Sequence, residues 1–147
     1  MKRHVYNVIA LMVMVGSMAL AAQAQSSGRV QLIANIPFDF QVGNKKLPAG
    51  EYTVVQVNPA SDNAVVQLRS KTGRASALVQ MSATIGRDEQ SAKLIFNRYG
   101  DHYFFAQAWI DEDRNGLQAA TPRSERAIML GLSGIKTREE AIALTRR

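Results

Sequence analysis

Cysteine is absent from this chain of 147 residues, and histidine occurs only at positions 4 and 102. Without cysteine no disulfide can form, so stability must come from a packed core, which a single domain of this length can build. A metal site on a histidine pair is excluded if the first residues are removed, and a catalytic triad would have to use His102. The G-x-S-x-G, P-loop and H-E-x-x-H motifs are also missing, as are internal repeats. The sequence therefore indicates no class of enzyme.

The beginning of the chain has the layout of a secretory signal peptide. A short basic region precedes an apolar run over residues 5–22, and Ala22-Gln23-Ala24 supplies the small residues of a cleavage site. We expect cleavage after Ala24, which removes residues 1–24 and leaves residues 25–147 as a single exported β domain, periplasmic or secreted. The alternative is an uncleaved anchor, because roughly 17–25 apolar residues span a bilayer. The polar stretch that follows Ala24 favours cleavage.

The exported part carries a small positive excess and no long basic block. The whole sequence has 18 basic and 12 acidic residues, and loss of Lys2 and Arg3 would leave a net charge near +4. An exported protein meets little nucleic acid, so we expect no nucleic-acid partner. A mild positive field favours anionic lipids or polysaccharides, although solubility explains it equally well. The expected partner is an unknown envelope component or a small apolar ligand, with membrane contact only through the signal peptide before cleavage.

Alternating apolar residues and turn formers predict a mainly β fold. Phe38, Phe40 and Val42 alternate with polar residues, and Pro48 and Gly50 suit a turn with positive φ at the glycine. Further strand patterns cover residues 29–35, 52–57, 64–69, 75–83, 92–97 and 103–110, and the last of these is apolar on both faces and should be central. With no βαβ alternation, the expected fold is an antiparallel β-sandwich or small β-barrel with a short C-terminal helical segment.

The character of the chain changes after residue 110. Residues 111–116 are expected to form a loop, and Thr121-Pro122 suits the start of a short helix that ends between Gly131 and Gly134. The tail, residues 137–147, has two interpretations. Thr137-Arg138-Glu139-Glu140 matches a capping box that would open a final helix, whereas the residues after it also suit an edge strand. The helix is slightly favoured.

Three sequence blocks resemble a group of small exported bacterial proteins that is common in soil bacteria. The blocks are FDFxVG at residues 38–43, LPAGxY at residues 47–52 and FxRYGDxYF at residues 96–104. A weaker similarity lies at Pro122-Arg123-Ser124-Glu125-Arg126, and the tail from Leu130 onward departs from the group. This group is uncharacterised, so the resemblance implies an exported β domain and no catalytic residues.

One alternative function is a hydrolase-like enzyme with an unrecognised site near His102. Asp39 and Asp101 are the carboxylates that such a site would use. A solvated turn beside Asp101 explains His102 without any chemistry. Arg98, Tyr99 and Tyr103 surround the same turn and suit either a binding surface or cross-strand aromatic pairs.

Another alternative is weak calcium binding at the 111–116 loop. Asp111, Asp113 and Asn115, followed by Gly116, match the first half of a calcium loop, in which alternate oxygens converge on the ion. The second half fails, because Pro122 stands where a bidentate glutamate belongs. We therefore assign no metal site, cofactor or catalytic residue.

The favoured interpretation is an exported non-catalytic β domain of structural or binding role, in the cell envelope or outside the cell. Binding would use an aromatic-lined face or a barrel mouth that includes Tyr52, Tyr103, Phe105 or Trp109. Those aromatic residues are equally suited to the core.

Overall fold

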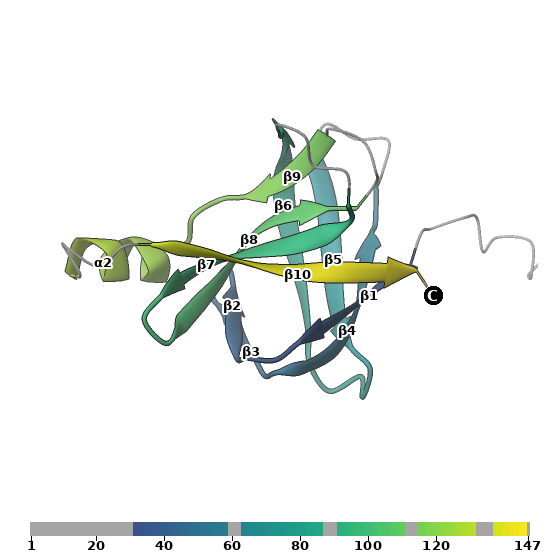
Figure 1. Ribbon diagram of the computed structural model, residues 1–147, viewed down its shortest axis with the longest axis horizontal. Coiled ribbons are helices and arrows are strands. Elements are labelled where there is room, and N and C mark those ends of the chain that lie inside the picture. Colours follow the sequence, from purple (N-terminus) through teal and green to yellow (C-terminus); the bar gives the residue numbers. More distant parts are fainter. Residues whose placement is uncertain (1–30, 59–62, 87–90, 111–114, 132–136, 147) are drawn as a thin grey trace, which may run out of the picture.

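The computed structural model describes residues 31–58, 63–86, 91–110, 115–131 and 137–146, and these residues form strands with one short helix (Figure 1). In chain order the elements are β1 (Gln31–Ile36), β2 (Phe40–Val42), β3 (Lys45–Leu47), β4 (Gly50–Gln56), β5 (Asn63–Ser70), β6 (Ser76–Ile85), β7 (Lys93–Tyr99), β8 (His102–Trp109), β9 (Asn115–Ala119), α2 (Arg123–Gly131) and β10 (Arg138–Arg146). The prediction of a mainly β fold is confirmed.

The strands close into a barrel. In the order β8, β7, β10, β1, β4, β5, β6 and β9, each strand pairs antiparallel with the next, and β9 pairs back onto β8 through Gln107 with Gln118 and Ala108 with Leu117. This last pairing joins the two ends of the sheet, so the fold is a barrel and not a sandwich. The strand over residues 103–110 was expected to be central, and β8 does have neighbours on both edges.

A short hairpin, β2–β3, extends the sheet beside β8 at one end of the barrel. Its turn contains Gly43, whose φ of 59° lies in the region that glycine adopts most readily. β2 pairs in parallel with β8 through Gln41 and Phe104, on the edge of β8 that β9 occupies further along the strand. β8 therefore has the hairpin beside its beginning and β9 beside its end. We call the end of the barrel that carries this hairpin and the turns at residues 70–75 and 99–102 the hairpin end.

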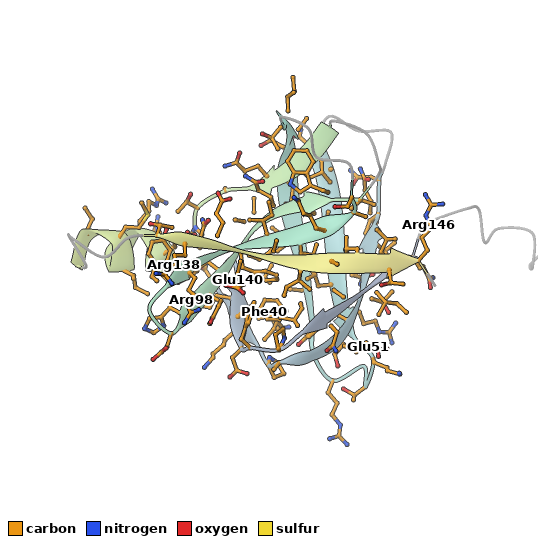
Figure 2. All side chains as sticks on the ribbon, in the orientation of Figure 1. Phe40, Glu51, Arg98, Arg138, Glu140 and Arg146 are labelled. Carbon is orange, nitrogen blue, oxygen red and sulfur yellow. The ribbon has the colours of Figure 1, made fainter. Side chains whose placement is uncertain are left out.

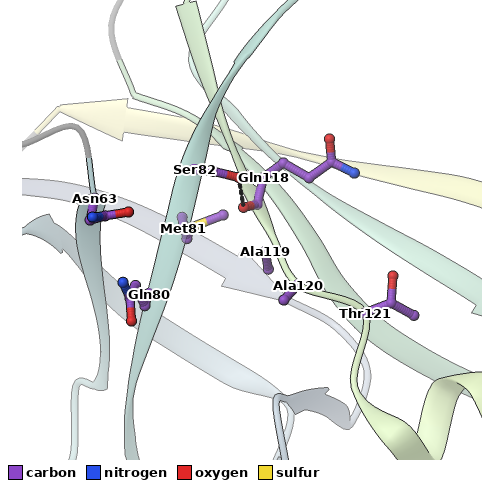
Figure 3. Close-up of a pocket in the computed structure, with 8 residues that line it drawn as sticks. All are labelled: Asn63, Gln80, Met81, Ser82, Gln118, Ala119, Ala120 and Thr121. Atoms are coloured by element: carbon purple, nitrogen blue, oxygen red, sulfur yellow. Dashed lines mark hydrogen bonds between the residues drawn. The ribbon is translucent and has the colours of Figure 1, made fainter.

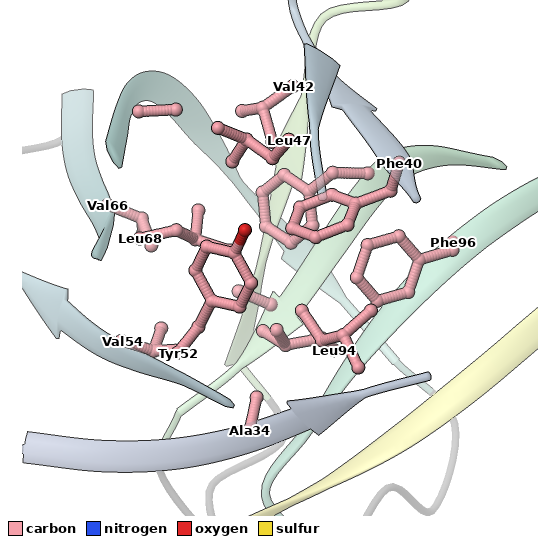
Figure 4. Packing of buried hydrophobic residues seen from close by; sticks show 14 of the residues in the cluster. Ala34, Phe40, Val42, Leu47, Tyr52, Val54, Val66, Leu68, Leu94 and Phe96 are labelled. Atoms are coloured by element: carbon pink, nitrogen blue, oxygen red, sulfur yellow. The ribbon is translucent and has the colours of Figure 1, made fainter. Parts of the chain in front are cut away.

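Inward-facing side chains fill the barrel (Figure 4). In strands, alternate residues face the same side, and the alternating burial along β1 and β5 follows that period. The buried cluster comprises Leu32, Ala34, Ile36, Phe40, Val42, Leu47, Tyr52, Val54, Val66, Leu68, Ala77, Met81, Leu94, Phe96, Phe105, Ala108 and Ile110. The interior formed by the described residues is thus a packed core.

The three sequence blocks at residues 38–43, 47–52 and 96–104 meet at the hairpin end. Asp39 Oδ1 accepts a hydrogen bond from the Ala49 N–H (3.0 Å), and the Tyr52 hydroxyl donates to the Pro48 carbonyl (2.6 Å). The Phe40 ring packs edge-on against the rings of Tyr52 and Phe96, with centroids 5.3 and 5.2 Å apart. Gly50 has a φ of 151°, so the prediction of positive φ there is confirmed. These blocks therefore have structural roles.

The predicted helix is present as α2 up to Gly131, and the rest of its expected end, residues 132–134, lies outside the described residues. The Arg126 N–H donates to the Pro122 carbonyl, which places the proline at the start of the helix. Glu125, the third helical residue, is only 2% exposed and contacts β7, while the Ser124 hydroxyl donates to Gln41 Oε1 on β2 (3.1 Å). Among the described residues, only the first turn of the helix thus contacts the barrel, and the rest of the helix extends beyond the hairpin end (Figure 1).

The tail forms a strand, so the slight preference for a final helix is wrong. β10 pairs with β7 over residues 138–143 and with β1 over residues 144–146. Figure 2 shows Arg138 and Arg146 at opposite ends of this strand. Glu140, Ile142 and Leu144 are half-buried on one face, while their neighbours are exposed. As a strand, the tail pairs its backbone N–H and C=O groups with the edges of both β1 and β7. This pairing outweighs the local preference for a helix that the capping-box pattern indicates.

Candidate functional site

A cleft lies where β9 separates from β6, and it is the first candidate site (Figure 3). Its volume is about 460 Å³, and its lining comprises Asn63, Gln80, Met81, Ser82, Gln118, Ala119, Ala120 and Thr121. In Figure 3, Gln80 on β6 and Thr121, beyond β9, lie on opposite sides of it. The Ser82 hydroxyl donates to the Gln118 carbonyl (3.5 Å) across the strands. None of the described residues that line the cleft is charged, so they offer amides, hydroxyls and backbone groups as partners.

A second hollow, of about 610 Å³, lies on the outer face of β1, β4 and β5. Cross-strand register aligns Ile33, Thr53 and Arg69 in one row and Gln31, Val55 and Gln67 in the next, and the turn that follows β5 borders both rows. We call this surface the outer groove. It combines amides, hydroxyls and charged groups with two aliphatic side chains.

The charges of the outer groove do not cancel. Lys71 Nζ lies 3.0 Å from Glu51 Oε1, so this lysine is paired. Arg69 is exposed, and the structure shows no carboxylate partner for its guanidinium among the described residues. Arg74 is exposed beside the same turn. No sequence motif marks this surface, since its residues come from three strands and one turn.

Asp39, Asp101 and His102 line one small hollow of about 160 Å³ together with Lys46. The structure therefore brings the residues of the hydrolase alternative near one another. Asp39 is occupied by the Ala49 N–H and by Lys46 Nζ at 3.5 Å. His102 is exposed, and among the described residues no hydrogen bond joins it to either carboxylate. The base and orienting carboxylate of a triad are thus not assembled in this structure.

Three of the four aromatic residues considered for a binding face are packed away from solvent. Tyr52, Phe105 and Trp109 are 1%, 2% and 3% exposed. Tyr103 is half-buried, and its ring stacks on Phe38 with centroids 3.8 Å apart. The Arg98 guanidinium lies 5.2 Å from the centroid of the same ring. This stack supports the interpretation of the turn as a hairpin held by ring contacts.

Asp111 and Asp113, of the proposed calcium loop, lie outside the described residues. Asn115 and Gly116, which were expected in a loop, instead begin β9. A Cβ atom at Gly116 would meet the Trp109 ring at 2.7 Å, so the tryptophan covers the glycine of the neighbouring strand. Close packing accounts for this glycine without a metal. The described residues contain no group of three or more histidine, aspartate or glutamate side chains able to hold a metal ion.

Glu125 is a buried ionisable residue that sequence reasoning did not single out. Its Oε1 accepts hydrogen bonds from Asn97 Nδ2 (2.8 Å) and from the Tyr99 hydroxyl (3.0 Å). Burial, followed by the hydrogen bond and charge of Glu125, raises the pKa of Tyr99 above its ordinary value of 10.0, and a hydrogen bond with Thr137 lowers it in part. Burial and the charge of Asp39 likewise raise the pKa of Tyr52. These groups hold the helix and the hairpin end in place.

Comparisons with protein-family models, with curated proteins and with solved structures found no match. Within the part of the chain that the structure describes, no helix is long and apolar enough to cross a membrane.

Proposed function

We propose that the protein is an exported, non-catalytic β-barrel that binds an anionic component of the cell envelope through the outer groove. The observation that carries this proposal is Arg69, a cation with no carboxylate partner among the described residues, which lines a hollow of about 610 Å³ that also offers amide and hydroxyl groups. Arg74, which is exposed in the turn beside this hollow, adds a second positive charge. The packed interior supports an external binding surface, because side chains occupy the volume that a ligand would need. Export rests on the signal-peptide pattern of residues 1–24.

Arginine is suited to this role, since its guanidinium stays charged and binds carboxylates or phosphates through two parallel hydrogen bonds. Thr53 and Gln67 stand next to Arg69 in the register and offer further hydrogen bonds. Acidic polysaccharides and anionic lipid headgroups share the chemistry that such a surface recognises. An acidic polysaccharide is favoured over a lipid headgroup. The hollow lies on the curved wall of the barrel, which fits a single polysaccharide chain better than the flat surface of a membrane.

Binding to polygalacturonate and to phosphatidylglycerol vesicles should be measured with the mature chain at low and high salt. Each basic residue near an anionic surface contributes about 1 kcal/mol, so Arg69→Gln should weaken binding about fivefold. Binding should also weaken as salt rises, since exposed charges are screened. Arg138→Gln, which removes one exposed charge from β10, is the matched control.

Equal losses in the two variants would show that net charge alone drives binding, and the outer groove would then have no special role. Binding to vesicles without binding to the polysaccharide would assign the surface to lipid headgroups. Absence of binding to both probes would refute the proposal.

The hydrolase alternative has one observation in its favour, the shared hollow of Asp39, Asp101 and His102. A His102→Ala variant that loses any hydrolytic activity found in the purified protein would restore it. Because Asp39 is held by two other partners, the non-catalytic proposal is better supported.

A further inference from the structure

Among the described residues, one edge of β6 has no strand partner along half of its length. β5 pairs with β6 over residues 76–82, whereas on the opposite edge β9 pairs only with residues 81–85. Residues 76–80 therefore have a neighbouring strand on one side only, within the part of the chain that the structure describes. We call this segment the open edge. The cleft between β6 and β9 lies at the Gln80 end of the open edge.

The register shows which backbone groups face outward along the open edge. The Ser70 N–H donates to the Ala75 carbonyl (2.8 Å), so odd-numbered residues of β6 bond to β5. Hydrogen-bonding directions alternate along an antiparallel strand, so Ser76, Leu78 and Gln80 turn their N–H and C=O groups to the open edge. Lys45 Nζ donates to the Ser76 carbonyl (2.6 Å) from that side, which agrees with this assignment.

The opposite wall of this opening is β3. Val42 and Lys45 flank the turn of the β2–β3 hairpin and form its first hydrogen-bonded pair. In the next pair, Gln41 turns its backbone groups toward β8. Its partner Lys46 therefore turns its own backbone groups away from β2. Among the described residues β3 and β6 do not pair as strands, and the hydrogen bond from the Lys45 side chain to Ser76 connects them. The barrel wall thus has a gap bordered on both sides by strand edges.

The side chains around the gap define what would fill it. Leu78 is 64% exposed on the outer face, while Val79 packs partly against the core on the inner face. An entering strand would therefore place apolar residues beside both. Lys45 is exposed at the Ser76 end, where it has no carboxylate partner among the described residues, so a negative group is favoured there.

We propose that the open edge of β6 binds an extended segment of a partner polypeptide, which adds as a strand and places a carboxylate next to Lys45. Main-chain hydrogen bonds to Leu78 and Gln80 would give the affinity, and Leu78 with Lys45 would give the selectivity. The segment covers five residues of β6, about 17 Å of extended chain. In the antiparallel orientation, which β9 already has, its C-terminal end lies at Ser76. This inference concerns a different surface from the outer groove and does not depend on it.

The first measurement is amide hydrogen exchange of the mature chain by NMR. In the free protein the amides of Leu78 and Gln80 should exchange fast, whereas those of Ala77 and Val79, which bond to β5, should be protected. The probe is an acetylated heptapeptide that alternates threonine and valine and ends in glutamate with a free carboxylate. When most of the protein is bound, protection at Leu78 and Gln80 should rise about tenfold.

Two controls separate strand addition from other binding. A probe that is N-methylated at the positions facing β6 should not bind, because it lacks the donors that an added strand needs. A second probe replaces the terminal glutamate by glutamine amide and so carries no carboxylate. It should bind the native protein more weakly than the first probe does, whereas the Lys45→Gln variant should bind the two probes with similar affinity. Leu78→Pro should abolish binding without removing a bond of the barrel, since this N–H faces the gap. Arg69→Gln should bind the probe normally.

Protection of Leu78 and Gln80 in the free monomer, or binding of the N-methylated probe with equal affinity, would overturn the proposal. Protection that appears only in a dimer would assign the open edge to a second copy of this chain and would overturn it as well. If Leu78→Pro does not fold, the N-methylated probe still decides the question, because it leaves the protein unchanged.

Discussion

Replacement of Glu125 tests how strongly its carboxyl oxygen contributes to the attachment of the helix to the barrel. In Glu125→Ala, Asn97 and Tyr99 both lose the acceptor that they share at 2.8 and 3.0 Å. A buried donor without a partner costs about 1–3 kcal/mol. The side chain of Asn97 is less buried and can recruit water, so the free energy of unfolding should fall by about 2–4 kcal/mol in total. Glu125→Gln keeps an acceptor oxygen and should lose only about 1 kcal/mol.

Urea unfolding followed by tryptophan fluorescence suits this measurement, because Trp109 is the single tryptophan and is 3% exposed. Glu139→Ala, which removes an exposed carboxylate from β10, is the matched control and should be nearly neutral. A double-mutant cycle with Tyr99→Phe should give a coupling of about 1 kcal/mol, since contacting residues do not contribute independently. A loss below about 0.5 kcal/mol in Glu125→Ala would refute the argument, since it would mean that water satisfies both donors.

Further outcomes follow from other packed groups. Gly116→Ala should cost about 1–3 kcal/mol and shift the emission of Trp109, because the new methyl group overlaps the ring; an unchanged urea midpoint would contradict this. The contribution of Tyr52 and Tyr99 to the free energy of unfolding should be constant up to about pH 10 and then fall. The reason is that the pKa of both phenols is raised in the folded chain, so the unfolded chain releases these protons at lower pH. Replacing both residues by phenylalanine should flatten the dependence of stability on pH in this range. Asp39→Ala removes the acceptor of the Ala49 N–H at the hairpin end and should lower the free energy of unfolding by about 1 kcal/mol. An unchanged free energy in urea unfolding would show that this hydrogen bond is dispensable.

Local patterns identified most of the elements. Strands with clear alternation, such as β5, and the turn with positive φ at Gly50 were placed correctly, because the period of two and the sign of φ are properties of the local chain. The short helix was predicted from Thr121-Pro122 for the same reason. β3 and β9 were missed, since three to five residues carry little periodicity.

The candidate sites were much less accessible from sequence. Asp39, Asp101 and His102 were grouped correctly, but the partners that occupy Asp39 could not be foreseen. Arg69 and Glu125 were not singled out as candidates, because their roles depend on neighbours far away in the chain. The nearest such neighbour of Glu125, Tyr99, is 26 residues away.

The sequence by itself determined a mainly β domain without disulfides, its turns and its short helix, since these follow from composition and from spacing over a few residues. Only the tertiary structure decided that the sheet closes through β8 and β9, that the tail becomes a strand between β1 and β7, and that half of one edge of β6 has no strand partner among the described residues. Each of these depends on pairing between residues distant in sequence. Backbone groups are the same at every position, so a strand's own residues do not specify which edge it will meet.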